Sequence, residues 1–336
     1  MSLNFRTGTL LALLLAFCSC QTPQSTLHPM GPASGRIATL EWIVLILFCL
    51  IAFSVLVLLF WAVMRRRGTL DSHAPWNEGG GQSWILIGGF AIPFVVLTFV
   101  FVYGLEAMSG YPMHDGGVKP AIKIIGHQFW WEIDYLGATA DKQFVTANEI
   151  HIPVGRPIDL ELISQDVIHS FWVPLLHGKV DLVPGQDNYI RIEANEPGTY
   201  RGQCAEYCGE QHARMMLLVV AQPEQDYQAW FDQQVQPAEE PTGQEAMHGR
   251  DVFMGAACAF CHTIRGTGAH GAVAPDLTHF ASRQGLAANS YPNDESDLEA
   301  WVTHAQSMKP GSEMPDLAEF NGANLRALVA YLKQLK

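Results

Sequence analysis

Two apolar runs of membrane length most constrain how this chain can fold. Residues 40–64 carry one internal charge, Glu41, near the edge of the run, and residues 84–105 form the second run. Each is long enough for an α-helix to cross a bilayer, which takes ~20 residues. Two buried core helices are the alternative, but the length of the runs and the arginine cluster 65–67 argue against it. The sequence therefore predicts a two-helix transmembrane hairpin over residues 37–105.

The arginine cluster 65–67 also predicts the topology, because basic residues are enriched in short cytoplasmic loops. Everything after residue 105 would then lie outside the cytoplasm. A short apolar core behind Arg6 resembles a secretory signal, which we expect over residues 1–20. Ser19-Cys20 resembles the end of a lipoprotein cleavage site, and lipidation of Cys20 is left open. We expect a multi-pass protein of the bacterial inner membrane, with its later domains on the periplasmic side.

The formal charge of -13 argues against a nucleic-acid partner, which would need a basic face. Much of the acidity lies in residues 222–245, which hold six acidic residues and no Lys or Arg. We predict an acidic linker over residues 223–245, and a docking surface for a basic electron carrier is the alternative. The seven cysteines all have other assignments, so we expect no structural disulfide.

Residues 121–222 have the pattern of short β-strands separated by turns that contain Gly and Pro. β-Branched residues gather in five segments, at 121–125, 149–152, 157–163, 189–192 and 216–220. Many short strands with turn signals predict an all-β sandwich or barrel.

A twelve-residue loop in this β region gathers soft metal ligands. It holds two thiols, Cys204 and Cys208, the imidazole of His212 and the thioether of Met215, and a second imidazole, His169, lies upstream. Sulfur ligands with imidazole favour copper, and two cysteines on one loop can bridge two metal ions. A tetrahedral zinc site is the alternative. Met215 argues against zinc, because a thioether is a poor zinc ligand.

The sequence Cys258-Ala-Phe-Cys261-His262 is the attachment signature of a c-type haem. Cys258 and Cys261 would form thioethers to the haem, and His262 would be the proximal iron ligand. The stretch 308–315 resembles the Lys-Pro-Gly…Met-Pro loop of small class I cytochromes c. That resemblance selects Met314 as the second axial ligand, with Met308 as the alternative. We predict an all-α cytochrome c domain over residues 246–336.

Four stretches resemble subunit II of haem–copper cytochrome c oxidases, namely residues 126–132, 166–171, 179–185 and 204–215. The resemblance implies a cupredoxin fold over residues 121–222 and a dinuclear, mixed-valence CuA centre. Together with the haem signature, it indicates a multidomain membrane protein in which a C-terminal cytochrome c is fused to subunit II, as in caa3-type oxidases.

Carried over by position, the resemblance implies a role for each ligand. Cys204 and Cys208 would bridge the two coppers, and His169 and His212 would each bind one. Met215 and the backbone carbonyl of Glu206 would be weak outer ligands. The Glu206 side chain would bind a magnesium or manganese ion shared with the catalytic subunit, which a hard carboxylate suits.

One position departs from the family. The family usually has a tryptophan after Gly-His-Gln that admits electrons from soluble cytochrome c, and here that position is Phe129. Trp130 and Trp131 follow it and are the candidate electron path. The alternative is that these aromatic residues only pack the domain.

These features together predict subunit II of a caa3-type oxidase. Electrons would enter at haem c, pass to CuA and continue to haem a of the catalytic subunit I, where oxygen is reduced to water and protons are pumped. The partners would be subunit I, other oxidase subunits, lipid, and a soluble or membrane-bound cytochrome c or another donor. Three other classes of protein fit the sequence less well. A relative of nitrous oxide reductase would need a histidine-rich domain, and this chain has none. A copper chaperone would not need the haem domain, and a quinol-oxidase subunit II would lack the copper ligands.

Overall fold

The computed structural model describes residues 24–65, 81–109 and 119–336. The predicted signal peptide with Cys18 and Cys20, and the arginines at positions 66 and 67, lie outside the described residues. The chain divides into two compact units. One comprises residues 35–111, and the other holds the residues before and after it.

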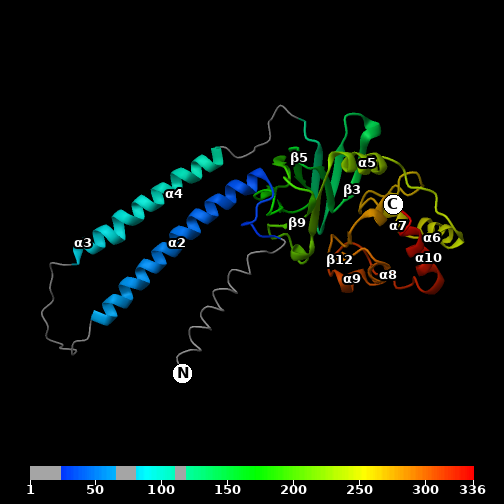
Figure 1. Ribbon diagram of the computed structural model, residues 1–336. Coiled ribbons are helices and arrows are strands. Elements are labelled where there is room, and N and C mark those ends of the chain that lie inside the picture. Colours follow the sequence, from blue (N-terminus) through cyan, green and yellow to red (C-terminus); the bar gives the residue numbers. More distant parts are fainter. Residues whose placement is uncertain (1–23, 66–80, 110–118) are drawn as a thin grey trace, which may run out of the picture. The chain divides into compact units, whose positions relative to one another are not determined.

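In the residues of the 35–111 unit that the structure describes, there are two apolar helical segments (Figure 1). Helix α2 spans Pro32–Arg65, and the second segment joins α3 (Gln82–Trp84), the π-helix η1 (Ile85–Ala91) and α4 (Ile92–Ser109). Both segments are long and apolar enough to cross a membrane, and their apolar windows are not buried inside the protein. The π-helical turn ends just before Pro93. A proline nitrogen has no hydrogen to donate, so Pro93 cannot contribute a backbone hydrogen bond to the helix.

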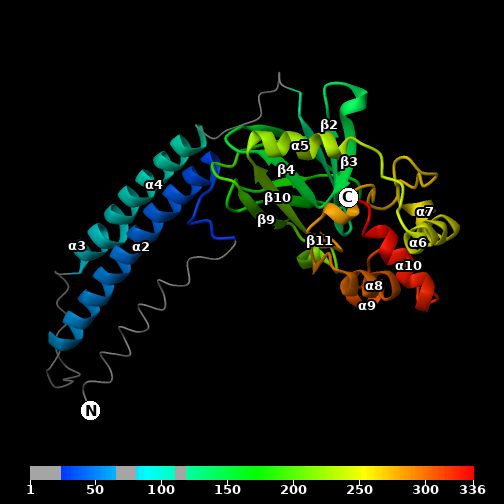
Figure 2. The ribbon, with the colours of Figure 1, turned by 45° about the vertical axis from the view of Figure 1, so that its right-hand side comes forward.

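The β region forms two five-stranded sheets (Figure 2). The strand order in the first is β3-β2-β1-β5-β8, and in the second β4-β10-β9-β6-β7. The strands are β1 (Ile122–His127), β2 (Trp130–Leu136), β3 (Gln143–Ala147), β4 (Glu149–Pro153), β5 (Ile158–Ser164), β6 (His169–Trp172), β7 (Val180–Leu182), β8 (Asn188–Ile192), β9 (Gly198–Cys204) and β10 (Met216–Gln222). The all-β sandwich is confirmed, and all five predicted strand segments are present.

The pattern of burial explains why these residues form strands. Every second residue of β1, β2 and β10 is buried, which is the period of a strand with one face on a core. Fully buried Ile124, Trp131 and Leu160 belong to the core between the sheets. Short 3₁₀ turns, η2 (Ala140–Lys142) and η3 (His212–Arg214), interrupt the connections.

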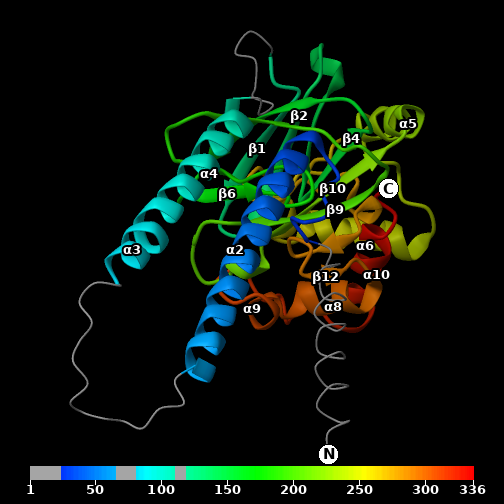
Figure 3. The same cartoon turned by 60° about the vertical axis from the view of Figure 1, so that its left-hand side comes forward.

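The C-terminal region is mostly helical, as predicted (Figure 3). Its elements are α6 (Gln244–Gly255), α7 (Cys258–Cys261), η4 (Phe280–Ser282), β11 (Gly285–Leu286), β12 (Tyr291–Pro292), α8 (Glu295–Thr303), α9 (Ala305–Met308) and α10 (Gly322–Leu332). The short β11–β12 ladder is an addition to the all-α domain that we predicted. Leu328, Leu332 and Leu335, which recur at helical spacing, are buried in the core of this region.

The segment predicted as an acidic linker contains helix α5 (Glu224–Gln234). Its indole Trp230 stacks on His151 of β4, with ring centroids 3.9 Å apart and planes 5° apart. Tyr227 is buried on the same helix. Helix α5 therefore packs on the β-sandwich, and the haem-bearing region is joined to it through residues 235–243.

Helices α6 and α10 cross at Gly249, where a Cβ atom would lie 1.8 Å from the carbonyl oxygen of Ala327. We expect Gly249→Ala to force the helices apart and to lower the free energy of unfolding by about 1–3 kcal/mol. Denaturant unfolding of the full chain in detergent measures this change. Gly255→Ala is the control, because nothing lies within 4 Å of its Cβ position. Equal stability of the two variants would contradict the close crossing.

Candidate metal centre and haem pocket

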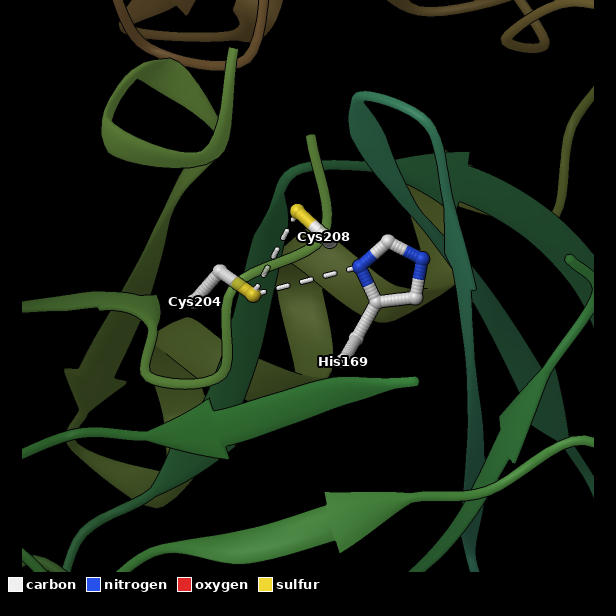
Figure 4. Close-up of side chains that lie close together, drawn as sticks. All are labelled: His169, Cys204 and Cys208. Atoms are coloured by element: carbon white, nitrogen blue, oxygen red, sulfur yellow. Dashed lines mark hydrogen bonds between the residues drawn. The ribbon is translucent and has the colours of Figure 1, made fainter. Parts of the chain in front are cut away.

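Three predicted metal ligands meet at one end of the sandwich (Figure 4). The ligand atoms of His169, Cys204 and Cys208 lie within 4.8 Å of one another. The Cys204 sulfur is 3.9 Å from the Cys208 sulfur and 3.9 Å from Nδ1 of His169. All three residues are buried, so a metal ion held here would be shielded from solvent.

The remaining predicted ligands surround the same two sulfurs. Nδ1 of His212 lies 3.7 Å, and the sulfur of Met215 3.4 Å, from the Cys208 sulfur. The backbone carbonyl oxygen of Glu206 is 3.2 Å from the Cys204 sulfur. The carboxylate of Glu206 lies 3.8 Å from the Lys179 ammonium and is about half exposed. The structure therefore brings all six predicted residues together, with the carbonyl and the side chain of Glu206 in different surroundings.

The strand pairing explains this convergence. His169 begins β6 and Cys204 ends β9, and these strands pair antiparallel with Phe171 opposite Cys204. Gly126 of β1 packs against the imidazole, since a Cβ there would lie 2.8 Å from Cδ2 of His169. Only glycine therefore lets β1 approach the ring at this point.

Asp166 orients the buried imidazole. Its carboxylate accepts a hydrogen bond from Nε2 of His169 at 2.7 Å, which leaves Nδ1 facing the sulfurs. Burial opposes protonation, but the hydrogen bonds with Cys204 and Asp166 outweigh it and raise the pKa of His169. Trp131 also holds the Cys204–Met215 loop in place, because its Nε1 donates to the Met215 carbonyl at 3.2 Å.

The two thiols have opposite acidities. The hydrogen bond with Cys208 lowers the pKa of Cys204 to about 3, although burial acts against this change. The same hydrogen bond and burial raise the pKa of Cys208. Thiolates are the metal-binding form of cysteine, so one sulfur is already prepared for a metal and the second needs the positive charge of the metal to ionise. The donor set of two thiols, two imidazoles and a thioether fits copper.

A second site is the apolar cavity in the helical region. Cys258, Cys261, His262 and Met314 line it together. Nδ1 of His262 donates to the Pro275 carbonyl at 2.7 Å, which leaves Nε2 free as a base. Burial lowers the pKa of His262 and so favours the neutral ring that binds iron. The donor set and the apolar lining fit a covalently attached haem.

The two candidate methionines lie in different places. Met314 lines the cavity, and its carbonyl accepts a hydrogen bond from Gln306 at 2.6 Å. Met308 presents its carbonyl to Arg214 of the copper domain, at 2.7 Å. This arrangement supports Met314 over Met308 as the ligand.

The two tryptophans of the candidate electron path differ in their contacts with the two sites. Trp131 is fully buried, and its ring makes a T-shaped contact with the His169 ring at a centroid distance of 6.0 Å. Trp130 stacks on His127 at 4.4 Å and lines the haem cavity. Phe129, at the position where the family has tryptophan, lines the same cavity.

The comparisons with known proteins match the two regions of the chain that contain these sites. A family model described as cytochrome C oxidase subunit II, periplasmic domain, matches residues 120–222, and one for cytochrome c matches residues 246–336. A cytochrome c oxidase subunit 2 from Alkalihalophilus pseudofirmus is 36% identical over 334 residues, which cover 97% of this chain and 95% of that protein. The chain belongs to the cytochrome c oxidase subunit 2 family.

Two further similar proteins are a curated relative and a solved structure. The cytochrome c oxidase subunit 2 of Bacillus subtilis is 27% identical over 354 residues, 99% of this chain and 98% of its own length. The crystal structure of the periplasmic domain of subunit II of a Bradyrhizobium japonicum cytochrome oxidase is 27% identical, with a TM-score of 0.31, and the match covers 34% of this chain and 91% of that one.

This subunit II therefore carries a fused cytochrome c domain and has an electron-transfer role in a haem–copper oxidase. Its two domains imply CuA and haem c. The apolar helices and the periplasmic-domain match identify a membrane-anchored protein with an outward domain. Asp166 and Gly126 lie in stretches that resemble the family, but neither had a predicted role. The three-residue spacing from Asp166 to His169 is a local signal that could have suggested the hydrogen bond, whereas the contact of Gly126 with His169 arises only on folding.

We expect Gly126→Ala to displace the His169 ring and to lower the copper content of the purified chain several-fold. Metal analysis of the full-length protein measures this loss. Gly198→Ala in β9 is the control, since its Cβ would meet Tyr200 at an ordinary 3.7 Å. A full copper complement in Gly126→Ala would show that the close approach of β1 is not required.

Proposed function

We propose that this chain is the electron-entry subunit of a caa3-type cytochrome c oxidase. The convergence of six predicted copper ligands supports this proposal most strongly. Their close sulfur–sulfur, sulfur–imidazole and sulfur–carbonyl distances arise in the same compact unit that holds a pocket for a c-type haem. With both groups bound, haem c and CuA would supply two one-electron centres, so that electrons arriving from outside could continue to haem a of subunit I, where oxygen is reduced to water and protons are pumped.

The proposed copper ligands have different roles. Cys204 and Cys208 are proposed as bridging thiolates, with one copper bound by His169 and the other by His212. Met215 and the Glu206 carbonyl are proposed as weak outer ligands. The buried, strand-held positions of these groups keep the donor atoms fixed, which suits an electron-transfer centre because little has to move when the charge changes.

The haem roles follow the same logic. Cys258 and Cys261 are proposed as thioether anchors, and His262 and Met314 as the axial ligands. The hydrogen bond from His262 to the Pro275 carbonyl fixes the ring so that Nε2 is available. A thioether ligand raises the reduction potential of a haem, as an electron acceptor near the end of a respiratory chain requires.

The surroundings of the chain are also proposed. The Glu206 carboxylate would bind magnesium or manganese at the contact with subunit I. The two apolar helices would cross the inner membrane as a hairpin over residues 37–105 and place the 121–222 and 246–336 domains in the periplasm. The external donor would be a soluble or membrane-bound cytochrome c or another carrier.

The direct test is metal and haem analysis of the purified full-length chain, with its electron paramagnetic resonance spectrum. We expect a dinuclear mixed-valence copper signal and one covalently bound haem. Zinc, or a single copper ion, in the Cys204–Met215 loop would overturn the proposal.

Replacing Cys204 with Ser should abolish the dinuclear copper signal, because a hydroxyl cannot replace the bridging thiolate. Electron paramagnetic resonance of the full-length variant measures it. Cys49→Ser is the matched control, since Cys49 is an exposed free cysteine of helix α2. A normal mixed-valence signal in Cys204→Ser would rule out the bridge.

Replacing Met314 with Ala should leave the haem attached, since the thioethers remain, and should lower its reduction potential, since a thioether ligand favours the reduced iron. Redox titration of the haem absorbance measures the potential. Met308→Ala is the matched control and should leave the potential unchanged. A change in Met308→Ala alone would move the ligand assignment to Met308.

A further inference from the structure

The copper and haem domains meet along a surface that we call the seam, formed by residues of 122–222 and of 283–312. Hydrogen bonds cross it at several points. The Glu149 carboxylate accepts from the backbone N–H groups of Gln284, at 2.6 Å, and Gly285, at 3.4 Å. The backbone N–H of Met216 donates to the Ala288 carbonyl at 3.1 Å. The seam is therefore specific and polar, unlike an accidental contact between tethered domains.

The copper loop itself takes part in the seam. Arg214, next to the proposed ligand Met215, donates to the Met308 carbonyl at 2.7 Å. Ser290 donates back to the Arg214 carbonyl at 2.8 Å. The loop that would hold copper is thus directly bound to the chain segment that precedes the haem ligand loop.

The most unusual group in the seam is Lys309. Its side chain is 2% exposed, although lysine is almost never fully buried without a partner. Its Nζ donates to the carbonyl oxygens of Phe129, at 2.7 Å, and Ala287, at 3.0 Å. Burial lowers the pKa of Lys309 to about 7, and the neutral amine also has N–H donors for both carbonyls. The two hydrogen bonds can therefore persist on either side of that pKa.

The Phe129 carbonyl that Lys309 binds belongs to the dipeptide Gln128-Phe129, which contacts both sites. The side-chain amide of Gln128 donates to the Cys208 carbonyl at 2.6 Å. A Cβ on Gly209 would meet the Phe129 ring at 3.1 Å, so the ring packs against the copper loop. Gln128 and Phe129 also line the haem cavity. One dipeptide therefore touches both the copper loop and the haem pocket.

We propose that Lys309 is a positioning residue that clamps the haem domain to the Phe129 carbonyl and so fixes the separation between the haem pocket and the copper loop. Its role in electron transfer rests on the proposed function. Its role in holding the seam does not. A short tether alone would only raise the local concentration of the haem domain, whereas the clamp selects one orientation.

The test compares Lys309→Met with the wild type in the full-length, haem- and metal-loaded protein. Methionine matches the lysine side chain as far as Cε and removes its donors. We expect the seam amides of Gln284 and Met216 to exchange hydrogen about tenfold faster or more, because the seam opens more often. We also expect electron transfer from haem to copper after flash reduction to slow about tenfold, with the haem potential and the copper resonance signal unchanged.

Lys333→Met is the matched control. Lys333 also donates to a backbone carbonyl, that of Asn293 at 2.6 Å, but within the haem domain. It should leave seam exchange and the internal transfer rate as in the wild type. Lys309→Arg keeps N–H donors and should recover part of both readouts. Lys309→Leu, which also lacks donors, replaces Lys309→Met if the latter does not fold.

Unchanged seam exchange in Lys309→Met would overturn the clamp. Faster exchange with an unchanged internal rate would overturn its positioning role. A lower haem potential would place Lys309 in support of the Met314 loop instead. Zinc or missing copper in the wild type would refute the proposed function, while the exchange measurement would still decide whether Lys309 holds the seam.

Discussion

The close approach of two buried sulfurs is the constraint on which the rest of this structure depends. Cys204 and Cys208 lie 3.9 Å apart with almost no solvent exposure, and two thiolates at that distance repel each other in a medium of low dielectric. The pKa values reflect this repulsion, since the pKa of Cys204 is lowered and that of Cys208 is raised. A metal cation removes the repulsion, and the sandwich supplies the rigid frame that keeps the sulfurs together until it arrives.

The sandwich positions the His169 imidazole beside the sulfurs through several kinds of contact. Pairing of β6 with β9 sets His169 beside Cys204, and Gly126 lets a strand of the opposite sheet press on the imidazole. Asp166 then fixes which nitrogen faces the sulfurs. Each contact restricts one degree of freedom of a ligand, which is how an outer layer of residues tunes a metal centre.

Much of this could be predicted from sequence, because metal ligands and haem anchors occur at short, chemically dictated spacings. The Cys204–Met215 loop, the Cys258–His262 signature and the strands rich in β-branched residues are each marked by a pattern within a short stretch of sequence. Strands β6 and β9 were less visible, since they carry His169 and Cys204 among mixed neighbours. Helix α5 was hidden in an acidic segment, where burial of Tyr227 and stacking of Trp230 outweigh the composition.

The contacts that join the domains could not be predicted from local pattern. Lys309 and Phe129 are 180 positions apart in the chain, and a lysine in a loop ordinarily reads as a solvated charge. Gly126 acts on a histidine that reaches it only once β1 and β6 have packed together, whereas Asp166 is only three residues from His169 in the chain. Local spacing therefore predicts which atoms could bind a metal, and tertiary structure decides how they are oriented.

The loop from Lys309 to Met314 has a thermodynamic consequence. Its first residue binds the copper domain, and its last lines the haem cavity. Two equilibria that share one short loop are linked, and linkage is reciprocal. To whatever degree iron ligation at Met314 favours a docked domain, docking must favour ligation by the same factor. Each half of the chain would then act as an allosteric effector of the other.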